Sequence, residues 1–167
     1  MRKLILFASI MLMMFGFSAY SDDIRVLKLE KFLSRYPFSP LISHTNEIVY
    51  CADKFGLDYR LYVAIAGAES SFGKRYPKHN SNLTGVLNGS KKFKSIYDNI
   101  HETHKIIATG KWYKKYRRTK DIKDLVYTYK GVPPYDRYIR AVKYTLHEIN
   151  SIKIFPEQTP PQYAERF

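Results

Sequence analysis

One acidic side chain, Glu69, stands where the sequence pattern predicts another buried apolar residue. It lies in the segment "AIAGAESSFGKRY" (64–76) and follows an apolar helical stripe formed by Leu61, Ile65 and Ala68. Partial burial and the negative C-terminal end of a helix dipole both raise the pKa of a carboxyl group in such a position. A raised pKa suits a general acid that donates a proton near neutral pH. The alternative interpretation is a glutamate that reaches solvent just beyond the core.

The other residue types with chemical potential are sparse. The one cysteine, Cys51, lies in a helical pattern and is expected to behave as a small buried hydrophobic residue. His101 and His104 are three apart on one expected helix, but no third ligand lies nearby in the sequence. We therefore expect both histidines at the surface, and the sequence predicts neither a metal site nor a cofactor.

The elements that must position Glu69 are expected to be mainly α-helical. Helical periodicity predicts helices over residues 22–36, 40–55, 57–71, 95–110, 119–129 and 135–152. Asp58 is expected to be the N-cap of the third helix, and Ser95 with Asp98 forms a capping box for the fourth. Gly56 and Gly110 are expected to end the helices that precede them.

Two segments do not fit this helical pattern. Residues 72–93 contain three glycines, one proline, three asparagines and no acidic residue, which predicts a long loop or a small hairpin around "NLTGVLNGS". A loop of this length inside a compact domain usually carries function. The segment "KWYKKYRR" (111–118) is expected to be a basic aromatic turn.

The N-terminal residues have the pattern of an export signal. Arg2 and Lys3 precede the uncharged apolar run 4–17, and a small-residue cleavage site ends at Ser21. A retained membrane anchor is the alternative, but the run is shorter than the roughly twenty residues of a spanning helix. We expect a signal peptide over 1–21, one domain over 22–152 and a Pro-rich tail over 153–167, in an exported protein without a stable membrane span.

The chain is strongly basic, with a formal net charge of +13. Such a charge favours nucleic acid, anionic lipid or an acidic polymer as a partner. Export argues against nucleic acid, and no nucleic-acid-binding motif is present. A cell-wall polymer that carries carboxylates fits better, although charge can also serve solubility alone.

Four short motifs, taken in order, resemble the lysozyme-like superfamily, and among its members the lytic transglycosylases and bacterial endo-N-acetylglucosaminidases. "AIAGAESSFGK" is similar to the Ala-x-x-x-x-Glu-Ser-x-Phe-Gly signature, and "NSNLTGV" (80–86) is similar to Asn-Asn-Leu-x-Gly-Ile. "YTYKG" resembles a Tyr-Asn-Ala-Gly motif that has lost its Asn and one residue of spacing, which matches Tyr129 and Gly131 to its ends. "PPYDRYIRAV" matches a closing Pro-x-x-x-Tyr-x-x-x-Val pattern and places Tyr138 on the final helix. The resemblance covers about 42–150, and "TGVLNG" replaces the usual Gly-Leu-Met-Gln segment.

This resemblance implies a lysozyme-like α domain and a role for each matched residue. Glu69 would be the catalytic acid and Ser70 its polar neighbour. The remaining residues would bind sugar or hold the Glu69 carboxyl group: Asn80, Asn82, Thr84, Gly85, Tyr129 and Tyr138. Turn chemistry for the asparagines and core packing for the tyrosines are the alternatives. Tyr127, Tyr135 and Trp112 are weaker candidates for stacking on a sugar.

The implied activity is cleavage of the bond between N-acetylmuramic acid and N-acetylglucosamine in peptidoglycan strands. A glycoside hydrolase usually needs a second carboxylate, but Asp98 and Glu102 are poor candidates, and Asp121, Asp124 and Asp136 are remote in sequence. One glutamate acting as acid and then as base, as in the lytic transglycosylases, fits better. The alternatives are a hydrolytic glucosaminidase or lysozyme and a non-catalytic wall-binding domain. Periplasmic and secreted locations both fit, and the sequence identifies no secretion-machine partner.

Overall fold

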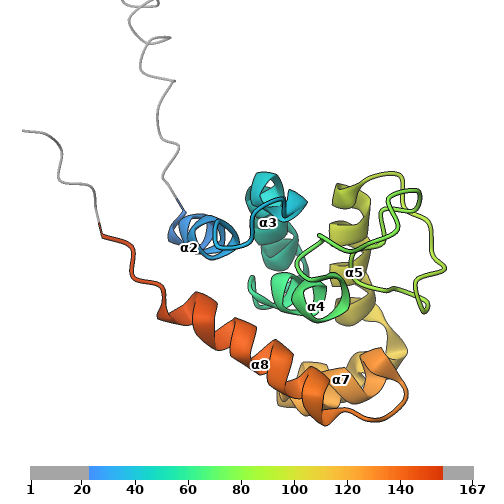
Figure 1. Cartoon of the computed structure of the whole chain (residues 1–167). Helices are drawn as coiled ribbons and strands as arrows, with labels where there is room; N and C mark the ends of the chain where they lie inside the picture. The colour runs from blue at the N-terminus through green and yellow to red at the C-terminus, as the bar shows by residue number, and fades with distance from the viewer. Residues whose placement is uncertain (1–22, 156–167) are drawn as a thin grey trace, which may run out of the picture.

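The computed structural model describes residues 23–155 and shows a mainly helical domain (Figure 1). The predicted signal peptide and the end of the Pro-rich tail, residues 156–167, lie outside the described residues. The α-helices are α2 (Ile24–Leu33), α3 (Thr45–Phe55), α4 (Leu61–Ser70), α5 (Ile96–Thr109), α6 (Lys114–Thr119), α7 (Ile122–Lys130) and α8 (Asp136–Ser151). Two 3₁₀ helices, η1 (Pro40–His44) and η2 (Lys111–Tyr113), precede α3 and α6.

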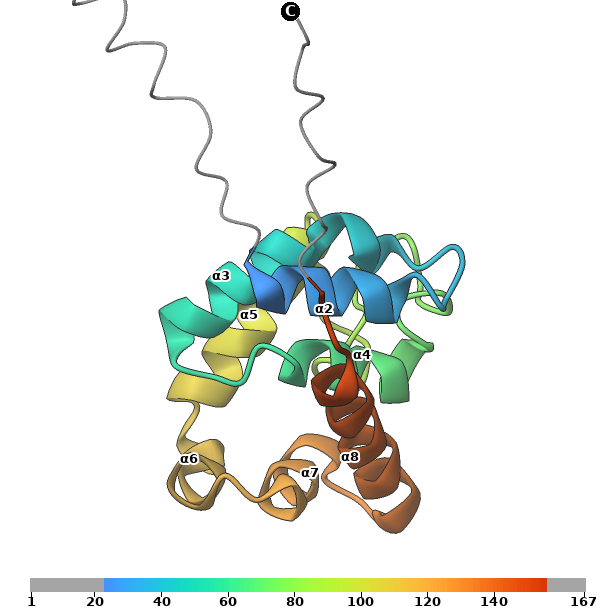
Figure 2. The same ribbon diagram turned by 90° about the vertical axis from the view of Figure 1, so that its left-hand side faces the viewer.

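Helix α4 occupies the centre of the domain because it is apolar on all sides. Its six residues Leu61–Ala66 are all buried, as expected of a helix that other elements surround. Helix α8 packs along α4, and α5 contacts both α3 and α4. Figure 2 shows α6 and α7 at the end of the domain opposite α2. No helix within 23–155 combines the length and the apolar character needed to cross a membrane.

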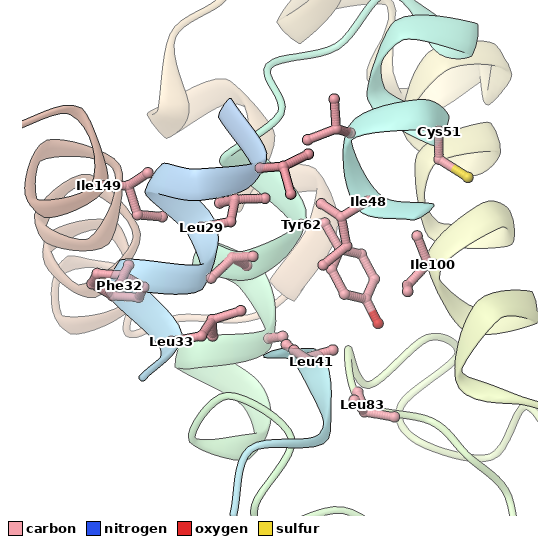
Figure 3. Packing of buried hydrophobic residues seen from close by; sticks show 14 of the residues in the cluster. Leu29, Phe32, Leu33, Leu41, Ile48, Cys51, Tyr62, Leu83, Ile100 and Ile149 are labelled. Carbon is pink, nitrogen blue, oxygen red and sulfur yellow. The ribbon is translucent and has the colours of Figure 1, made fainter. Parts of the chain in front are cut away.

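Two hydrophobic clusters lie on different faces of α4. The larger includes Tyr62 of α4 and side chains of α2, α3, α5 and α8, and Figure 3 shows its packing. Cys51 is fully buried in this cluster, which confirms its expected role as a small hydrophobic residue. The smaller cluster joins Leu61 and Ile65 to Tyr113, Tyr116 and residues of α5 and α7. Glu69 therefore lies at the end of a helix that packs against a hydrophobic cluster on each of two faces.

Most expected helix ends agree with the structure. Gly56 ends α3 in the left-handed conformation with φ 63°, and Gly110 follows the last residue of α5. The Ser95 side chain accepts a hydrogen bond from the Asp98 N–H, so one half of the expected capping box is present. The unpaired backbone groups at the ends of α3 and α5 thus find hydrogen-bond partners only a few residues away. A sequence pattern can therefore predict these helix ends.

Three local expectations were wrong. The helix expected over 40–55 is divided into η1 and α3. Asp58 is not the N-cap of α4, because its carboxylate accepts hydrogen bonds from Arg60 and forms a separate turn before Leu61. "KWYKKYRR" is η2 followed by α6 rather than a turn, since Tyr113 and Tyr116 are three residues apart and pack into the smaller cluster. The expectation for residues 72–93 is met in its first form, because no strand occurs in the described part of the chain and the segment is a long loop rather than a hairpin.

His104 also differs from expectation because it is buried, with 2% of its surface exposed. Its ring stacks on Tyr62 with centroids 5.6 Å apart, and its Nδ1 lies 2.8 Å from the Ile100 carbonyl oxygen. Burial lowers the pKa of His104 to about 4, so the ring is neutral at physiological pH. A neutral, stacked histidine belongs to the core between α4 and α5.

Candidate active site

Glu69 lies in the last turn of α4, immediately before a sharp reversal of the chain. Ser71, Phe72 and Gly73 all have positive φ, and the Phe72 ring folds back onto Gly67. A Cβ atom on Gly67 would lie 2.5 Å from this ring, so only glycine fits there. The reversal ends the helix directly beyond Glu69 and leaves that side chain free to reach the surface.

Ser70 stabilises this helix end from the inside. Its hydroxyl donates to the Ala66 carbonyl oxygen at 3.0 Å and accepts from the Gly73 N–H at 2.9 Å. Ser70 is buried, and both hydrogen bonds are local. The structure thus places Ser70 beside Glu69 as the resemblance implies, but its hydroxyl serves the turn rather than an open cleft.

The Glu69 carboxyl group meets Tyr138 and Gly85, which come from distant parts of the chain. The Tyr138 hydroxyl donates to Oε1 at 2.8 Å, across 69 residues of sequence. On the other side, Gly85 is so close that a Cβ atom there would lie 2.8 Å from Oε2. Three of the expected site residues are therefore brought together, one from α4, one from α8 and one from the long loop.

A buried polar network fixes the position of Gly85. The Tyr129 hydroxyl donates to the carbonyl oxygen of Thr84, the residue before Gly85. The Thr84 side chain contacts the Thr103 hydroxyl at 2.8 Å and accepts from the Asn99 amide at 3.0 Å. Tyr129 and Thr84 thus position the glycine rather than contact the Glu69 carboxyl directly.

Asn99 is the centre of this network and was not among the expected site residues. Its Oδ1 accepts from the Tyr62 hydroxyl at 2.7 Å and from the Leu83 N–H at 3.3 Å. Asn99 and Thr103 are both fully or almost fully buried on α5. Their spacing of four residues, on the same helix as the buried Ile100 and Ile107, was the available sequence signal.

Asn80 and Asn82 use their side-chain amides inside the loop. The Asn80 amide donates to the Gly89 carbonyl oxygen at 2.9 Å, and its Oδ1 accepts from the Asn82 N–H at 3.0 Å. The Asn82 amide donates to the carbonyl oxygens of Val86 and Lys91. Both side chains are almost fully buried. This arrangement favours turn chemistry over direct sugar binding for the two asparagines.

The site raises the pKa of Glu69, mainly by burial of its carboxyl end. The residue as a whole is exposed, but its oxygens are the atoms that lie against Gly85 and Tyr138. The hydrogen bond from Tyr138 and the positive charge of Lys130 lower the pKa and offset part of this effect. Burial and the nearby Glu69 charge also raise the pKa of Tyr138, so its hydroxyl keeps its proton and remains a donor.

No second carboxylate of residues 23–155 is among the groups that shift the pKa of Glu69. Glu102 lies between Lys91 and Lys105, and Asp124 lies 2.7 Å from Lys115. Asp121 accepts the Lys123 N–H as the N-cap of α7. Asp121 and Asp124, which are remote from Glu69 in sequence, therefore have other partners. Asp136, the third such residue, is not among the groups that shift the Glu69 pKa.

A groove of about 360 Å³ extends from Gly85. It is lined by the loop 85–88, by residues of α5 and α7, by Trp112 and Tyr113, and by Gly131 just after α7; the α5 and α7 residues are Thr103, Ile106, Thr128, Tyr129 and Lys130. Trp112 thus lies in the groove, whereas Tyr127 and Tyr135 do not line it and stack edge-to-face on each other at 4.8 Å. The groove thus brings an aromatic ring and a lysine to the same hollow as Gly85, the residue that lies against the Glu69 carboxyl, whereas Glu69 itself does not line it.

Neither a metal centre nor a known relative accounts for this arrangement. Within the described residues, no group of three or more His, Cys, Asp or Glu side chains could hold a metal ion. Comparison of the chain with protein-family models, curated proteins and solved structures gives no match.

Proposed function

We propose that this chain is an exported peptidoglycan-cleaving glycosidase of the lytic transglycosylase type, with Glu69 as its acid and base. The observation that carries the proposal is the Glu69 carboxyl group, held between the Tyr138 hydroxyl and Gly85, a residue that lines the groove. A single carboxylate with a raised pKa matches a reaction that needs a proton donor first and a proton acceptor second.

In the first step, Glu69 protonates the glycosidic oxygen between N-acetylmuramic acid and N-acetylglucosamine. The bond from this oxygen to the sugar C1 breaks, and its electron pair stays on the oxygen. The carbonyl oxygen of the substrate's own N-acetyl group stabilises the positive centre at C1. This substrate group takes the part that a second carboxylate plays in most glycosidases.

In the second step, the ionised Glu69 accepts the proton of the muramic 6-hydroxyl group. The 6-oxygen then bonds to C1, which closes a 1,6-anhydro ring and restores the protonated acid. Tyr138 helps because its hydroxyl donates to the carboxylate that exists between the two steps. Lys130 adds a positive charge that stabilises the same ionised form.

The central helix, the long loop and the closing helix α8 support the lysozyme-like part of the proposal, because they carry the resembling motifs in their expected order. The signal-peptide pattern at 1–21 supports export to the periplasm or the medium. Without residues 1–21 the chain keeps 26 basic and 15 acidic residues, and this net charge of +11 supports an anionic polymer as the partner.

The test is digestion of purified peptidoglycan, with the soluble products identified by mass spectrometry. Three proteins are compared: the wild type, Glu69→Gln and the matched control Glu47→Gln. Glu47 lies on α3 beside His44, away from the groove, so its substitution controls for loss of a negative charge. The proposal expects 1,6-anhydro products from the wild type and the control, and none from Glu69→Gln.

Two other outcomes would change the assignment. Products with reducing ends, lost in Glu69→Gln, would identify a hydrolase of the glucosaminidase or lysozyme kind. Binding without any release of product, equal in all three proteins, would identify a non-catalytic wall-binding domain.

A further inference from the structure

The segment 111–120 has one buried face and one exposed face, and the exposed face is basic. Tyr113 and Tyr116 are buried in the smaller hydrophobic cluster. Four exposed cations follow the first of them by three, four and seven residues, a spacing that places them on one side of η2 and α6: Lys111, Lys114, Lys115 and Arg118. These four residues are called the basic strip below.

Most of the positive charge of the basic strip has no carboxylate beside it. The segment 111–120 contains no acidic residue. Lys115 pairs with Asp124 at 2.7 Å, and the other three cations of the strip make no salt bridge within the described residues. An open hollow of about 490 Å³ is lined by Lys114, Lys115 and Arg118. A hollow with such a lining favours an anionic occupant.

The backbone beneath the basic strip is held on two sides. The Arg117 side chain donates through Nη1 to the carbonyl oxygens of Ile107 and Gly110, at 3.1 and 2.7 Å, which ties α6 to the end of α5. The Thr119 hydroxyl donates to Asp124 at 2.8 Å, which ties α6 to α7. The strip therefore presents its cations from a fixed surface, so binding orders little of the backbone.

Trp112 lies beside the first cation of the basic strip. It is the only tryptophan in the chain, and 73% of its surface is exposed. The Lys111 ammonium group lies 4.7 Å from the centre of its ring, which joins the tryptophan to the strip. An exposed tryptophan among cations is typical of proteins that bind membrane surfaces, because the ring lies at the level of the lipid headgroups while the cations meet phosphates. A soluble phosphate polymer would pair with the cations but would leave the ring in water.

We propose that Trp112 and the basic strip form a peripheral docking surface for a membrane that contains anionic phospholipid. The Trp112 ring enters the headgroup layer, and the cations of the strip contact lipid phosphates. Because Trp112 also lines the groove beside Gly85, a docked protein would hold that groove next to the headgroups. This inference does not depend on the catalytic proposal, and failure of either leaves the other standing.

The test is binding to lipid vesicles, with Trp112 emission and co-sedimentation as the two measurements. The protein is expressed from its full coding sequence. Vesicles of phosphatidylcholine alone are compared with vesicles that also contain phosphatidylglycerol, which is anionic. Soluble polyphosphate is the third ligand, because it offers phosphate charge without a lipid layer. Any binding through the apolar run 4–17 would be the same in every variant and would appear with both kinds of vesicle.

Two double variants separate the basic strip from the net charge of the chain. The first, Lys114→Gln with Arg118→Gln, removes two cations of the strip. The matched control, Arg140→Gln with Lys143→Gln, removes the same two residue types from exposed positions on α8. Each cation near an anionic bilayer contributes about fivefold to the affinity, so the strip variant should bind anionic vesicles roughly ten- to thirtyfold more weakly. The control should lose less than about threefold, because its cations lie outside the contact.

Anionic vesicles should also shift the Trp112 emission to shorter wavelength, whereas phosphatidylcholine vesicles and polyphosphate should not. Trp112→Ala should weaken binding to anionic vesicles, and Trp112→Phe should restore part of it. Added salt should release the protein from anionic vesicles, because it screens the charge of the strip.

Three results would overturn the inference. Equal losses in the two double variants would assign the binding to net charge rather than to the basic strip. Binding to anionic vesicles with an unchanged Trp112 emission would place the contact on another surface. Tighter binding to polyphosphate than to anionic vesicles would identify a soluble polymer as the partner of the strip. Digestion of peptidoglycan decides the catalytic proposal separately in each of these cases.

Discussion

Replacing Gly85 with alanine tests whether the position of the Glu69 carboxyl group matters for the proposed reaction. The added methyl carbon would lie 2.8 Å from Oε2, whereas ordinary contacts of this kind begin at 3.4 Å. The loop cannot easily move away from Glu69, because the Tyr129 hydroxyl donates a hydrogen bond to the carbonyl oxygen of Thr84, the residue before Gly85. The carboxyl end of Glu69 is flexible and must therefore move by about 0.6 Å, which follows from the two distances.

The expected effects on stability and activity differ in size. Gly85 has φ 68°, and a residue with a Cβ in that conformation costs about 1–2 kcal/mol in the free energy of unfolding. The contact itself adds little, because Glu69 can swing toward solvent. The rate of the proposed reaction would depend on the placement of the acid, and a shift approaching 1 Å can reduce a rate on the order of 100-fold. We expect Gly85→Ala to lose about 10- to 100-fold in the rate of peptidoglycan cleavage.

Gly56→Ala is the matched control. Gly56 has φ 63° and no heavy atom within 4 Å of the added Cβ, so it carries the same backbone cost without the contact. Urea unfolding should give similar losses of stability for the two variants, while initial rates of muropeptide release should fall only in Gly85→Ala. Equal activity in both variants would refute the argument that Gly85 keeps the Glu69 carboxyl in place.

Three further predictions concern the same region. Glu69→Gln should raise the free energy of unfolding at neutral pH, because folding raises the pKa of this carboxyl group and the folded protein therefore loses stability as the pH rises through that pKa. The gain in stability should disappear below the ordinary glutamate pKa. Urea unfolding that shows no gain at pH 8 would contradict this prediction. Tyr138→Phe removes a hydrogen bond that lowers the Glu69 pKa, so the alkaline limb of the pH profile of kcat/KM should move to higher pH, with a lower maximum; an unmoved limb would disagree. Asn99→Ala leaves the buried Tyr62 hydroxyl without its acceptor and should lower the free energy of unfolding, measured with urea, by about 2–3 kcal/mol. A decrease below about 1 kcal/mol would show that the fold does not depend on this hydrogen-bond network.

The sequence was most informative where the structure depends on neighbours along the chain. Helix α5 could be predicted from Ser95 at one end and Gly110 at the other, because both act within one turn of the helix. The position of Tyr138 on the final helix is confirmed, but its bond to Glu69 spans 69 residues and no local pattern contains it. Only the motif resemblance indicated that the two side chains belong together.

The local errors have physical reasons that recur. Asp58 has the residue type of an N-cap, but Arg60 competes for its carboxylate and closes a turn first. Helix α6 is short, and Tyr113 and Tyr116 supply too brief an apolar stripe to separate it from a turn. For Asn80, loop closure and sugar binding require the same amide chemistry, so only the observed partners distinguish them.

The hydrogen bond between Glu69 and Tyr138 also sets an order of events during synthesis of the chain. A ribosome releases α4 long before α8, and the truncated chain carries the acidic group without the hydroxyl that holds it. The two groups meet only when the last helix of the domain packs along the central one. A chain interrupted anywhere before Tyr138 therefore carries Glu69 without the hydroxyl group that donates to it, and this pair of side chains is complete only when translation of the domain is nearly finished.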